Sequence, residues 1–157
     1  MTSFKRGVLL SAMSVCILLC LYSYLFLWNL SKSFAESNPS IAYMRWPILI
    51  GCLIMLTGAL FALLLGIRAA AQTEQKIFSQ KTVRTLSWMG RSLAVSTAAI
   101  LGIWIYALTQ LGDEVGLVGA YLMIFLVFFF TASSVMFFLR DLFARAVEFR
   151  TENELTV

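Results

Sequence analysis

The sequence contains no histidine, and only 13% of its 157 residues are charged. The lack of histidine excludes bis-histidine haem ligation, histidine-bearing zinc sites, and catalysis by Ser-His-Asp or Cys-His groups. The chain also lacks the G-x-x-x-x-G-K-[ST] loop that binds phosphates in many nucleotide-binding proteins. These absences predict a protein that is not an enzyme and that has no cofactor and no metal site.

Charge is also absent from four long stretches, residues 7–31, 46–67, 92–112 and 115–139. About 20 helical residues, each rising about 1.5 Å, match a hydrocarbon core about 30 Å thick, so each stretch is long enough to cross a membrane. The hydrophobic fraction of 61% agrees with this interpretation. We predict an all-α polytopic membrane protein, a four-transmembrane-helix bundle that forms a single domain over residues 1–157. Proton-coupled transport is disfavoured because these stretches hold no charged group.

The basic residues predict the orientation of the bundle, because short loops rich in Lys and Arg stay on the cytoplasmic side. Ten of the 12 Lys and Arg residues lie before the first span, in the connection 68–91, or after the fourth span. The first connection has only Lys32 and Arg45. The predicted topology therefore places both termini in the cytoplasm (N-in/C-in). We assign the net charge of +4 to this topology and to contact with the lipid bilayer, and we expect no direct nucleic-acid binding.

Two segments outside the predicted spans have helical patterns, the connection 68–91 and the C-terminal segment 140–157. In the connection, Ser79 suits a helix N-cap, and Phe78 and Val83 hold the positions of a hydrophobic staple. This predicted helix runs into the third span. The C-terminal segment is predicted to continue the fourth span as an amphipathic helix with a polar, acidic tail. The basic residues of both segments suit either anionic lipid or a partner protein.

Small residues recur at every fourth position in three predicted spans, which puts each set on one side of its helix. Such sets allow helices to approach closely in membranes. We expect them to pack the bundle internally, with a seam between copies of a homo-oligomer as the less favoured alternative. The predicted packing residues are Gly58, Ala62 and Gly66, then Ala94, Ala98 and Gly102, and then Gly112, Gly116 and Ala120.

Three cysteines are the candidates for redox chemistry, Cys16, Cys20 and Cys52. Cys16 and Cys20 lie four residues apart in the first span, and this spacing differs from the C-x-x-C pair typical of thiol oxidoreductases. We interpret all three as small buried hydrophobic residues. A thiol redox sensor is kept as a low-weight alternative.

Two short runs of sequence suggest a family. The run from Lys76 to Leu86, KIFSQKTVRTL, and the ending from Glu152 to Val157, ENELTV, resemble the two signatures of a bacterial family of small four-span membrane proteins of unknown function, DUF2975. In that family the first signature has Ile-Phe-Ser followed by Val and Leu. The second has Glu-Asn-Asp-Leu-Thr, and Glu154 here replaces the Asp. The resemblance implies a multi-pass protein of the bacterial cytoplasmic membrane, often encoded beside a small helix-turn-helix regulator, and it implies no catalytic residue.

The leading functional hypothesis is a non-catalytic membrane regulator or adaptor that presents its cytoplasmic segments to a partner, with a helix-turn-helix regulator as the candidate implied by the resemblance. The alternative is a small-molecule transport or binding protein with a pocket between the spans. The expected pocket lining is aromatic and consists of Tyr22, Tyr24, Trp104, Tyr106 and Tyr121. The expected partner-binding residues are Phe78, Ser79, Val83, Arg84 and Leu86 in the connection, and Glu152, Asn153, Glu154 and Leu155 in the tail.

Overall fold

The computed structural model describes residues 3–71, 79–112 and 116–155. These residues form α1 (Ser3–Ser37), the short 3-10 helix η1 (Pro39–Met44), α2 (Arg45–Ala70), α4 (Gln80–Leu111) and α5 (Gly116–Leu155), and they contain no strand. Four segments are long and apolar enough to cross a membrane: Gly7–Ser37, Pro39–Ala70, Gln80–Leu111 and Val118–Phe149. The predicted all-α fold with four candidate membrane spans is therefore confirmed.

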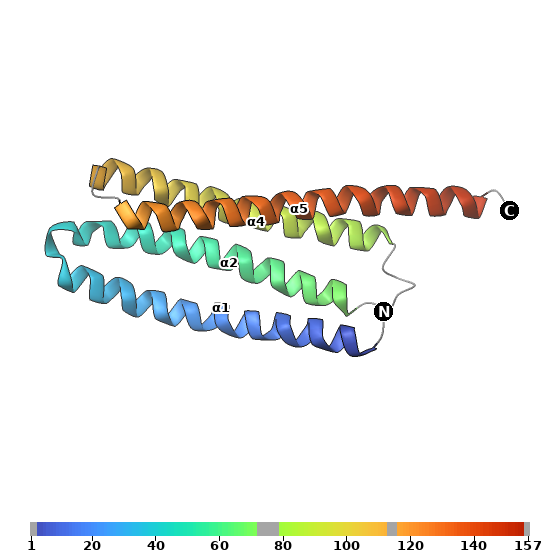
Figure 1. The fold of residues 1–157 in the computed structure, drawn as a ribbon, viewed down its shortest axis with the longest axis horizontal. Coiled ribbons are helices and arrows are strands. Elements are labelled where there is room, and N and C mark those ends of the chain that lie inside the picture. Colours follow the sequence, from blue (N-terminus) through green and yellow to red (C-terminus); the bar gives the residue numbers. More distant parts are fainter. Residues whose placement is uncertain (1–2, 72–78, 113–115, 156–157) are drawn as a thin grey trace.

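Each long helix runs antiparallel to its neighbour in sequence, so the helix ends gather at two places (Figure 1). The short helix η1, the end of α4 and the start of α5 lie at one end of the molecule, which we call the η1 end. The start of α1, the end of α2, the start of α4 and the end of α5 lie at the other, which we call the terminal end. The two described ends of the chain therefore lie on the same side of the molecule.

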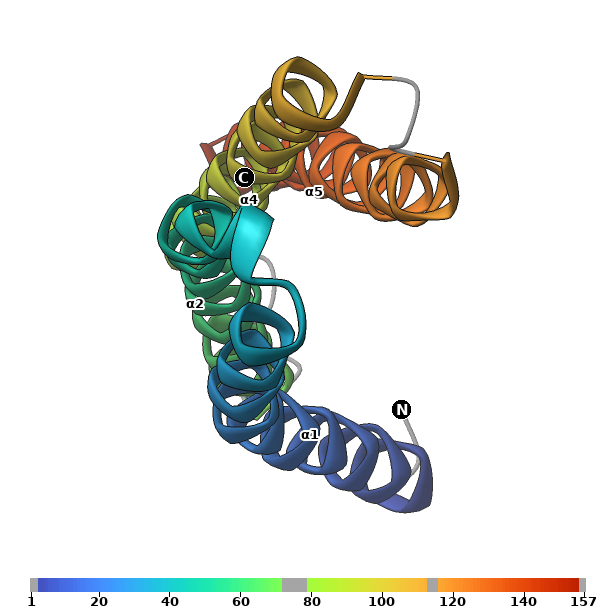
Figure 2. The ribbon, with the colours of Figure 1, turned by 90° about the vertical axis from the view of Figure 1, so that its left-hand side faces the viewer.

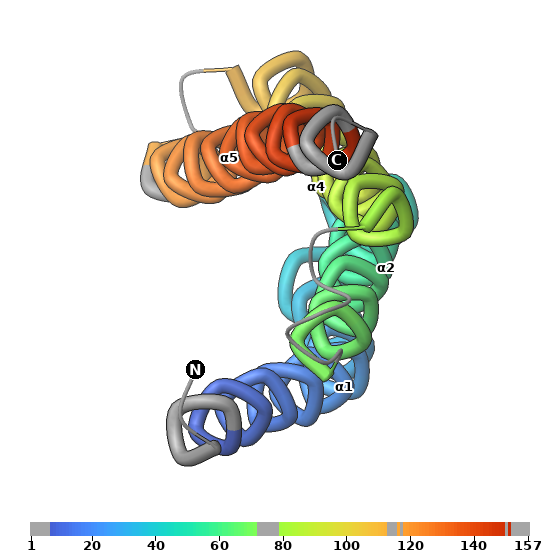
Figure 3. Tube along the Cα trace, turned by 90° about the vertical axis from the view of Figure 1, so that its right-hand side faces the viewer, coloured from blue at the N-terminus to red at the C-terminus, as the bar shows by residue number. Residues whose placement is uncertain are grey.

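The four long helices form an open arc in the order α1, α2, α4, α5, and each packs on its neighbour in sequence (Figure 2 and Figure 3). A closed four-helix bundle would also pair α1 with α5, and these two helices make no comparable contact. None of the described side chains of α1 is buried. The structure thus differs from the predicted bundle. The physical reason is that lipid is as apolar as the side chains, so no hydrophobic driving force closes the ring.

The helix α4 is the centre of the packing, because it contacts α2 on one side and α5 on the other. A core cluster joins these three helices and consists of Ala62 from α2, Leu93 and Ile100 from α4, and Phe129 from α5. Ile100 is completely buried. The core of the protein therefore lies along α4, and among the described residues α1 makes its main contacts with α2 and η1.

Two serine hydroxyls join α4 to its neighbours. Ser96 Oγ donates a hydrogen bond of 2.9 Å to the backbone oxygen of Met55 in α2. Ser133 Oγ of α5 donates one of the same length to the backbone oxygen of Gly90 in α4. Both serines are buried. Interhelical hydrogen bonds of this kind contribute about 0.6 kcal/mol each within membranes, so their main effect here is to fix the register of α4 against both partners.

Gly58 lets α2 and α4 approach closely at the level of Ser96. A Cβ atom on Gly58 would collide with Ser96 Oγ and would lie 2.7 Å from the backbone oxygen of Ser92. Ala62 and Gly66, the next members of the predicted set on α2, are both buried. The packing set on α2 therefore lies in helix contacts, as its spacing predicts.

The predicted set on α4 does not pack the helices. Ala94, Ala98 and Gly102 lie on the exposed side of α4, and a Cβ atom on Gly102 would meet nothing within 4 Å. The buried side of α4 instead carries larger residues such as Leu93 and Ile100. The prediction was wrong because small size allows close approach but does not decide which side of a helix finds a neighbour.

The third predicted set lies at the turn between α4 and α5. Gly112 and Gly116 have positive φ angles of 52° and 33°, a backbone region that favours glycine. A Cβ atom on either would meet nothing within 4 Å, and Ala120 is exposed. These two glycines therefore allow the backbone conformation at the turn and do not pack helices. Near the start of α5, the small residue that is buried is Gly119.

Candidate functional site

The start of α4 is where the sequence predicts it. Ser79 has an extended backbone (φ −136°, ψ 154°), and the helix begins at Gln80. The backbone oxygen of Ser79 accepts hydrogen bonds from the amides of Thr82 (2.9 Å) and Val83 (3.3 Å). The Ser79 side chain makes no capping bond to the backbone, and its Oγ lies 3.4 Å from Thr82 Oγ1. Phe78, the predicted staple residue, lies outside the described residues.

The two segments predicted to contact a partner pack against each other. The helices α4 and α5 run antiparallel (Figure 1), and the hydrogen bond from Ser133 to Gly90 gives their register, so the part of α5 beyond Ser133 runs back along the start of α4. Leu86 on α4 and Val147 on α5 are both buried. Leu86 therefore packs in the folded core, and its expected role in binding a partner stays a prediction.

A polar cavity of about 450 Å³ lies over this packed region. Arg140 of α5 lines it together with residues from the first turns of α4. We call it the arginine groove, and its lining residues are Gln80, Val83, Arg84, Ser87, Trp88, Arg91 and Arg140. Of the predicted partner-binding residues whose side chains the structure describes, Val83 and Arg84 lie in it, and Ser79 and Leu86 do not.

The arginine groove has a surplus of positive charge. Arg140 is paired with the adjacent Asp141, with Nη2 2.6 Å and Nε 2.8 Å from Oδ1. Arg84 and Arg91 are exposed and form no ion pair within the part of the chain that the structure describes. The guanidinium of Arg91 lies 5.5 Å from the ring centre of Trp88, which holds it over an aromatic face. Two guanidinium groups are thus free to bind an anion.

Sequence reasoning missed Arg91 and Arg140 as groove residues. The separation of seven residues between Arg84 and Arg91 puts both on one side of α4, and this signal was available in the sequence. Arg140 joins them only because of the register of α5 against α4. That register depends on tertiary contacts such as Ser133 to Gly90, which no local pattern encodes.

The C-terminal tail continues α5. The backbone is helical as far as Leu155, and the end of α5 projects beyond the other helices at the terminal end (Figure 1). The side chains of Glu152, Asn153, Glu154 and Leu155 lie outside the described ones. Along the helix axis, these residues lie about 18 Å or more beyond Arg140. The structure therefore does not bring the tail into the arginine groove.

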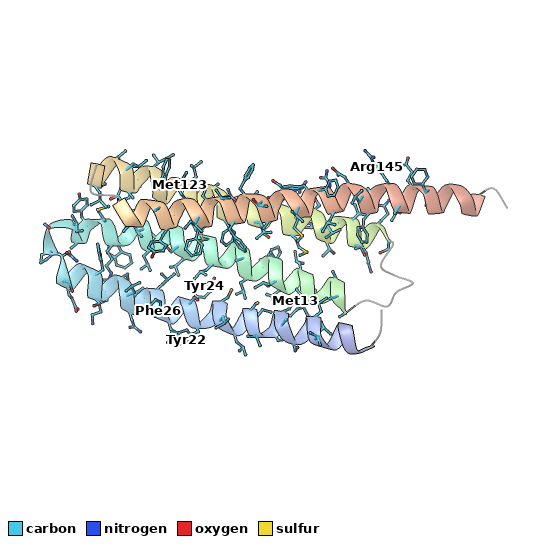
Figure 4. The ribbon with its side chains drawn as sticks, viewed as in Figure 1. Met13, Tyr22, Tyr24, Phe26, Met123 and Arg145 are labelled. Carbon is cyan, nitrogen blue, oxygen red and sulfur yellow. The ribbon has the colours of Figure 1, made fainter. Side chains whose placement is uncertain are left out.

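The predicted aromatic pocket is not formed. Tyr22 and Tyr121 are 66% and 62% exposed. Tyr22 points away from the other helices, whereas Tyr24 lies between α1 and α2, where its hydroxyl is 2.8 Å from Thr57 Oγ1 (Figure 4). A different cavity, of about 330 Å³, lies at the η1 end and includes none of the five expected residues. We call it the η1 cavity.

The three cysteines are free thiols. Cys16 is exposed on α1, Cys20 is half-buried, and Cys52 lines the η1 cavity. The expectation that all three are buried was therefore wrong for Cys16, since α1 has a neighbour on one side only. The thiol redox sensor stays a prediction, which a chain with all three cysteines changed to serine would test.

A family model described as protein of unknown function (DUF2975) matches residues 29–157. The chain belongs to this family. The region that DUF2975 covers includes α2, α4 and α5, and hence every residue of the arginine groove. It also includes both segments that carry the resemblance noted in the sequence. No curated protein and no solved structure matches the chain.

Proposed function

We propose that this DUF2975 protein is a non-catalytic membrane adaptor that binds an acidic segment of a partner protein in the arginine groove. The main support for this proposal is the position of Arg84 and Arg91, which have no ion pair among the described residues. In the groove they lie beside Trp88 and the half-buried Val83. Arg and Trp are enriched among the residues that dominate binding energy at protein interfaces. An acidic segment with one apolar side chain matches both the charge and the apolar part of this surface.

The proposed orientation places the arginine groove in the cytoplasm. The excess of Lys and Arg at the terminal end supports this assignment, because such residues keep short loops on the cytoplasmic side. We propose the bacterial cytoplasmic membrane as the location, following the resemblance described above. The same resemblance makes a small helix-turn-helix regulator the candidate partner. Such a regulator would be held at the membrane through an acidic surface that binds the arginine groove.

Copurification from native membranes tests this proposal. The tagged full chain is crosslinked in cells, extracted in mild detergent and analysed for attached proteins. We expect a cytoplasmic protein to be recovered with the unchanged chain and lost with the Arg84→Gln/Arg91→Gln variant. Two charge-assisted contacts of about 1.5 kcal/mol each would make the loss of affinity about 100-fold.

The matched control removes the same amount of charge outside the groove. Lys81 of α4 and Arg145 of α5 are exposed, and Arg145 projects outward from α5 (Figure 4). We expect Lys81→Gln/Arg145→Gln to retain the partner. Recovery of the unchanged chain alone would count against an adaptor. Equal loss of the partner in both variants would indicate a general effect of charge at the membrane surface and would refute a role for the groove.

A further inference from the structure

The η1 cavity lies at the opposite end of the molecule from the arginine groove, and all four long helices line it. Leu30 and Phe34 come from α1, Ile103 from α4 and Leu122 from α5. Because α1 and α5 stand at opposite ends of the arc, a cavity that both of them line lies on its concave side (Figure 2 and Figure 3). The volume of about 330 Å³ falls within the range of small-molecule sites.

Arg45, the first residue of α2, is the one charged residue that lines the η1 cavity within the described part of the chain. Its guanidinium carbon lies 5.8 Å from the ring centre of Trp28 and 5.4 Å from that of Trp46. These two rings meet edge to face, with their centres 6.5 Å apart. Arg45 Nε is buried and has no hydrogen-bond partner within the described residues. A buried charged donor without an acceptor is costly, so an anion that pairs with this guanidinium would be stabilised here.

The charge around Arg45 favours an anion. Among the described residues, no Asp or Glu lines the η1 cavity, and Glu36 of α1 is exposed, with its carboxylate 4.0 Å from Lys32 Nζ. Trp28 and Trp46 already contact the guanidinium of Arg45, so these rings do not form a free aromatic site for a ligand cation such as choline. A ligand with a net negative head and an apolar body fits the combination of one cation and hydrophobic walls.

We propose that the η1 cavity binds one anionic phospholipid, with an acyl chain against Phe34, Ile103 and Leu122 and the phosphate on Arg45. The cavity lies among helices that are long and apolar enough to cross a membrane, so lipid chains reach it from the side. Tryptophan is enriched at the level of lipid headgroups, which is where the phosphate would meet Arg45. The site uses no residue of the arginine groove and does not depend on the proposed adaptor function.

Lipid retention by the purified full chain tests this inference. The protein in neutral detergent is titrated with phosphatidylglycerol or phosphatidylcholine, and bound lipids are counted by native mass spectrometry. We expect one phosphatidylglycerol per chain, bound about tenfold more tightly than phosphatidylcholine, and we expect Arg45→Gln to abolish this preference. Val118 lines the cavity and is 56% exposed, so Val118→Trp fills space without disturbing the core and lowers retention of both lipids.

The matched control is Lys32→Gln, because Lys32 is an exposed basic residue near the same end that does not line the cavity. We expect it to keep the preference. A second experiment measures occupancy of the η1 cavity without Arg45 variants. Cys52, which lines the cavity, is labelled by N-ethylmaleimide in a chain carrying Cys16→Ser and Cys20→Ser. Phosphatidylglycerol should slow this labelling more than phosphatidylcholine does.

Three results would overturn the inference. One is equal retention of the two lipids, and another is an unchanged preference in Arg45→Gln. The third is displacement of phosphatidylglycerol by an equal concentration of palmitate, because this would identify a single-chain carboxylic acid as the occupant.

Discussion

At the residue scale, the contact between α2 and α4 depends on a glycine facing a serine. Gly58 has no side chain, and the hydroxyl of Ser96 occupies the space that a Cβ atom there would need. Ser96 is thereby close enough to bond to the backbone oxygen of Met55. The pair Gly58 and Ser96 thus gives both the close approach of the two backbones and the hydrogen bond between the helices.

We expect Gly58→Ala to lower the free energy of unfolding by about 1–3 kcal/mol, because the added methyl group overpacks the contact. Unfolding in detergent micelles, followed by circular dichroism, measures this change. Gly102→Ala is the matched control, since Gly102 lies on the exposed side of α4 with open space around it. It should leave stability unchanged or raise it by up to about 1 kcal/mol, as alanine favours helix. Equal losses in both variants would contradict the assignment.

Residue patterns predicted some contacts and missed others for a clear reason. The spacing of Gly58, Ala62 and Gly66 indicated the packed side of α2. The same spacing in Ala94 and Ala98 indicated the wrong side of α4, because both sides of this span carry small and apolar residues and their spacing does not tell one side from the other. Only the positions of neighbouring helices decide which of two apolar sides is buried.

At the element scale, α5 is the longest helix, with 40 residues and hence a length of about 60 Å. This is about twice the thickness of a hydrocarbon core. Among its described side chains, Val147 is the last buried one, and it follows the stretch that packs along the start of α4. Beyond it, α5 projects past the other helices (Figure 1). The helix therefore divides into a part that supports the fold and a terminal part that does not.

Two truncations test this division. Removal of residues 152–157 should leave the unfolding temperature in detergent unchanged, because the end of α5 lies beyond the other helices. Removal of residues 140–157 should lower the free energy of unfolding by about 2 kcal/mol, because it exposes the surface against which Val147 packs. An equal loss in the two truncated chains would show that the tail supports the fold, contrary to this division.

The elements themselves followed from the sequence better than their arrangement did. The absence of charge over long stretches directly reflects the apolar solvent around a span, and so the four helices were predicted. The start of α4 after Ser79 and the continuation of α5 also followed from local signals. The arginine groove did not follow from local signals. It depends on the register between α4 and α5, because its α4 residues lie far from Arg140 in the sequence.

At the scale of the whole molecule, both described ends of the chain lie on one side, and η1 lies on the other (Figure 1). We expect a reporter that is active only in the cytoplasm to work when it is fused after Val157. The same reporter should fail when inserted next to Ser37, because the few basic residues of that connection favour the opposite side of the membrane. Activity in the reverse pattern would overturn the N-in/C-in orientation.

The open arc also bears on how the protein is made. The contacts follow chain order, α1 with α2, α2 with α4, and α4 with α5. A helix that leaves the ribosome therefore meets a neighbour that is already in the membrane, and no early segment waits for the last one to be synthesised. Proteins with such local contacts assemble fast and from the N-terminus onward. A closed ring would instead require α1 to stay unpaired on one side until translation was complete.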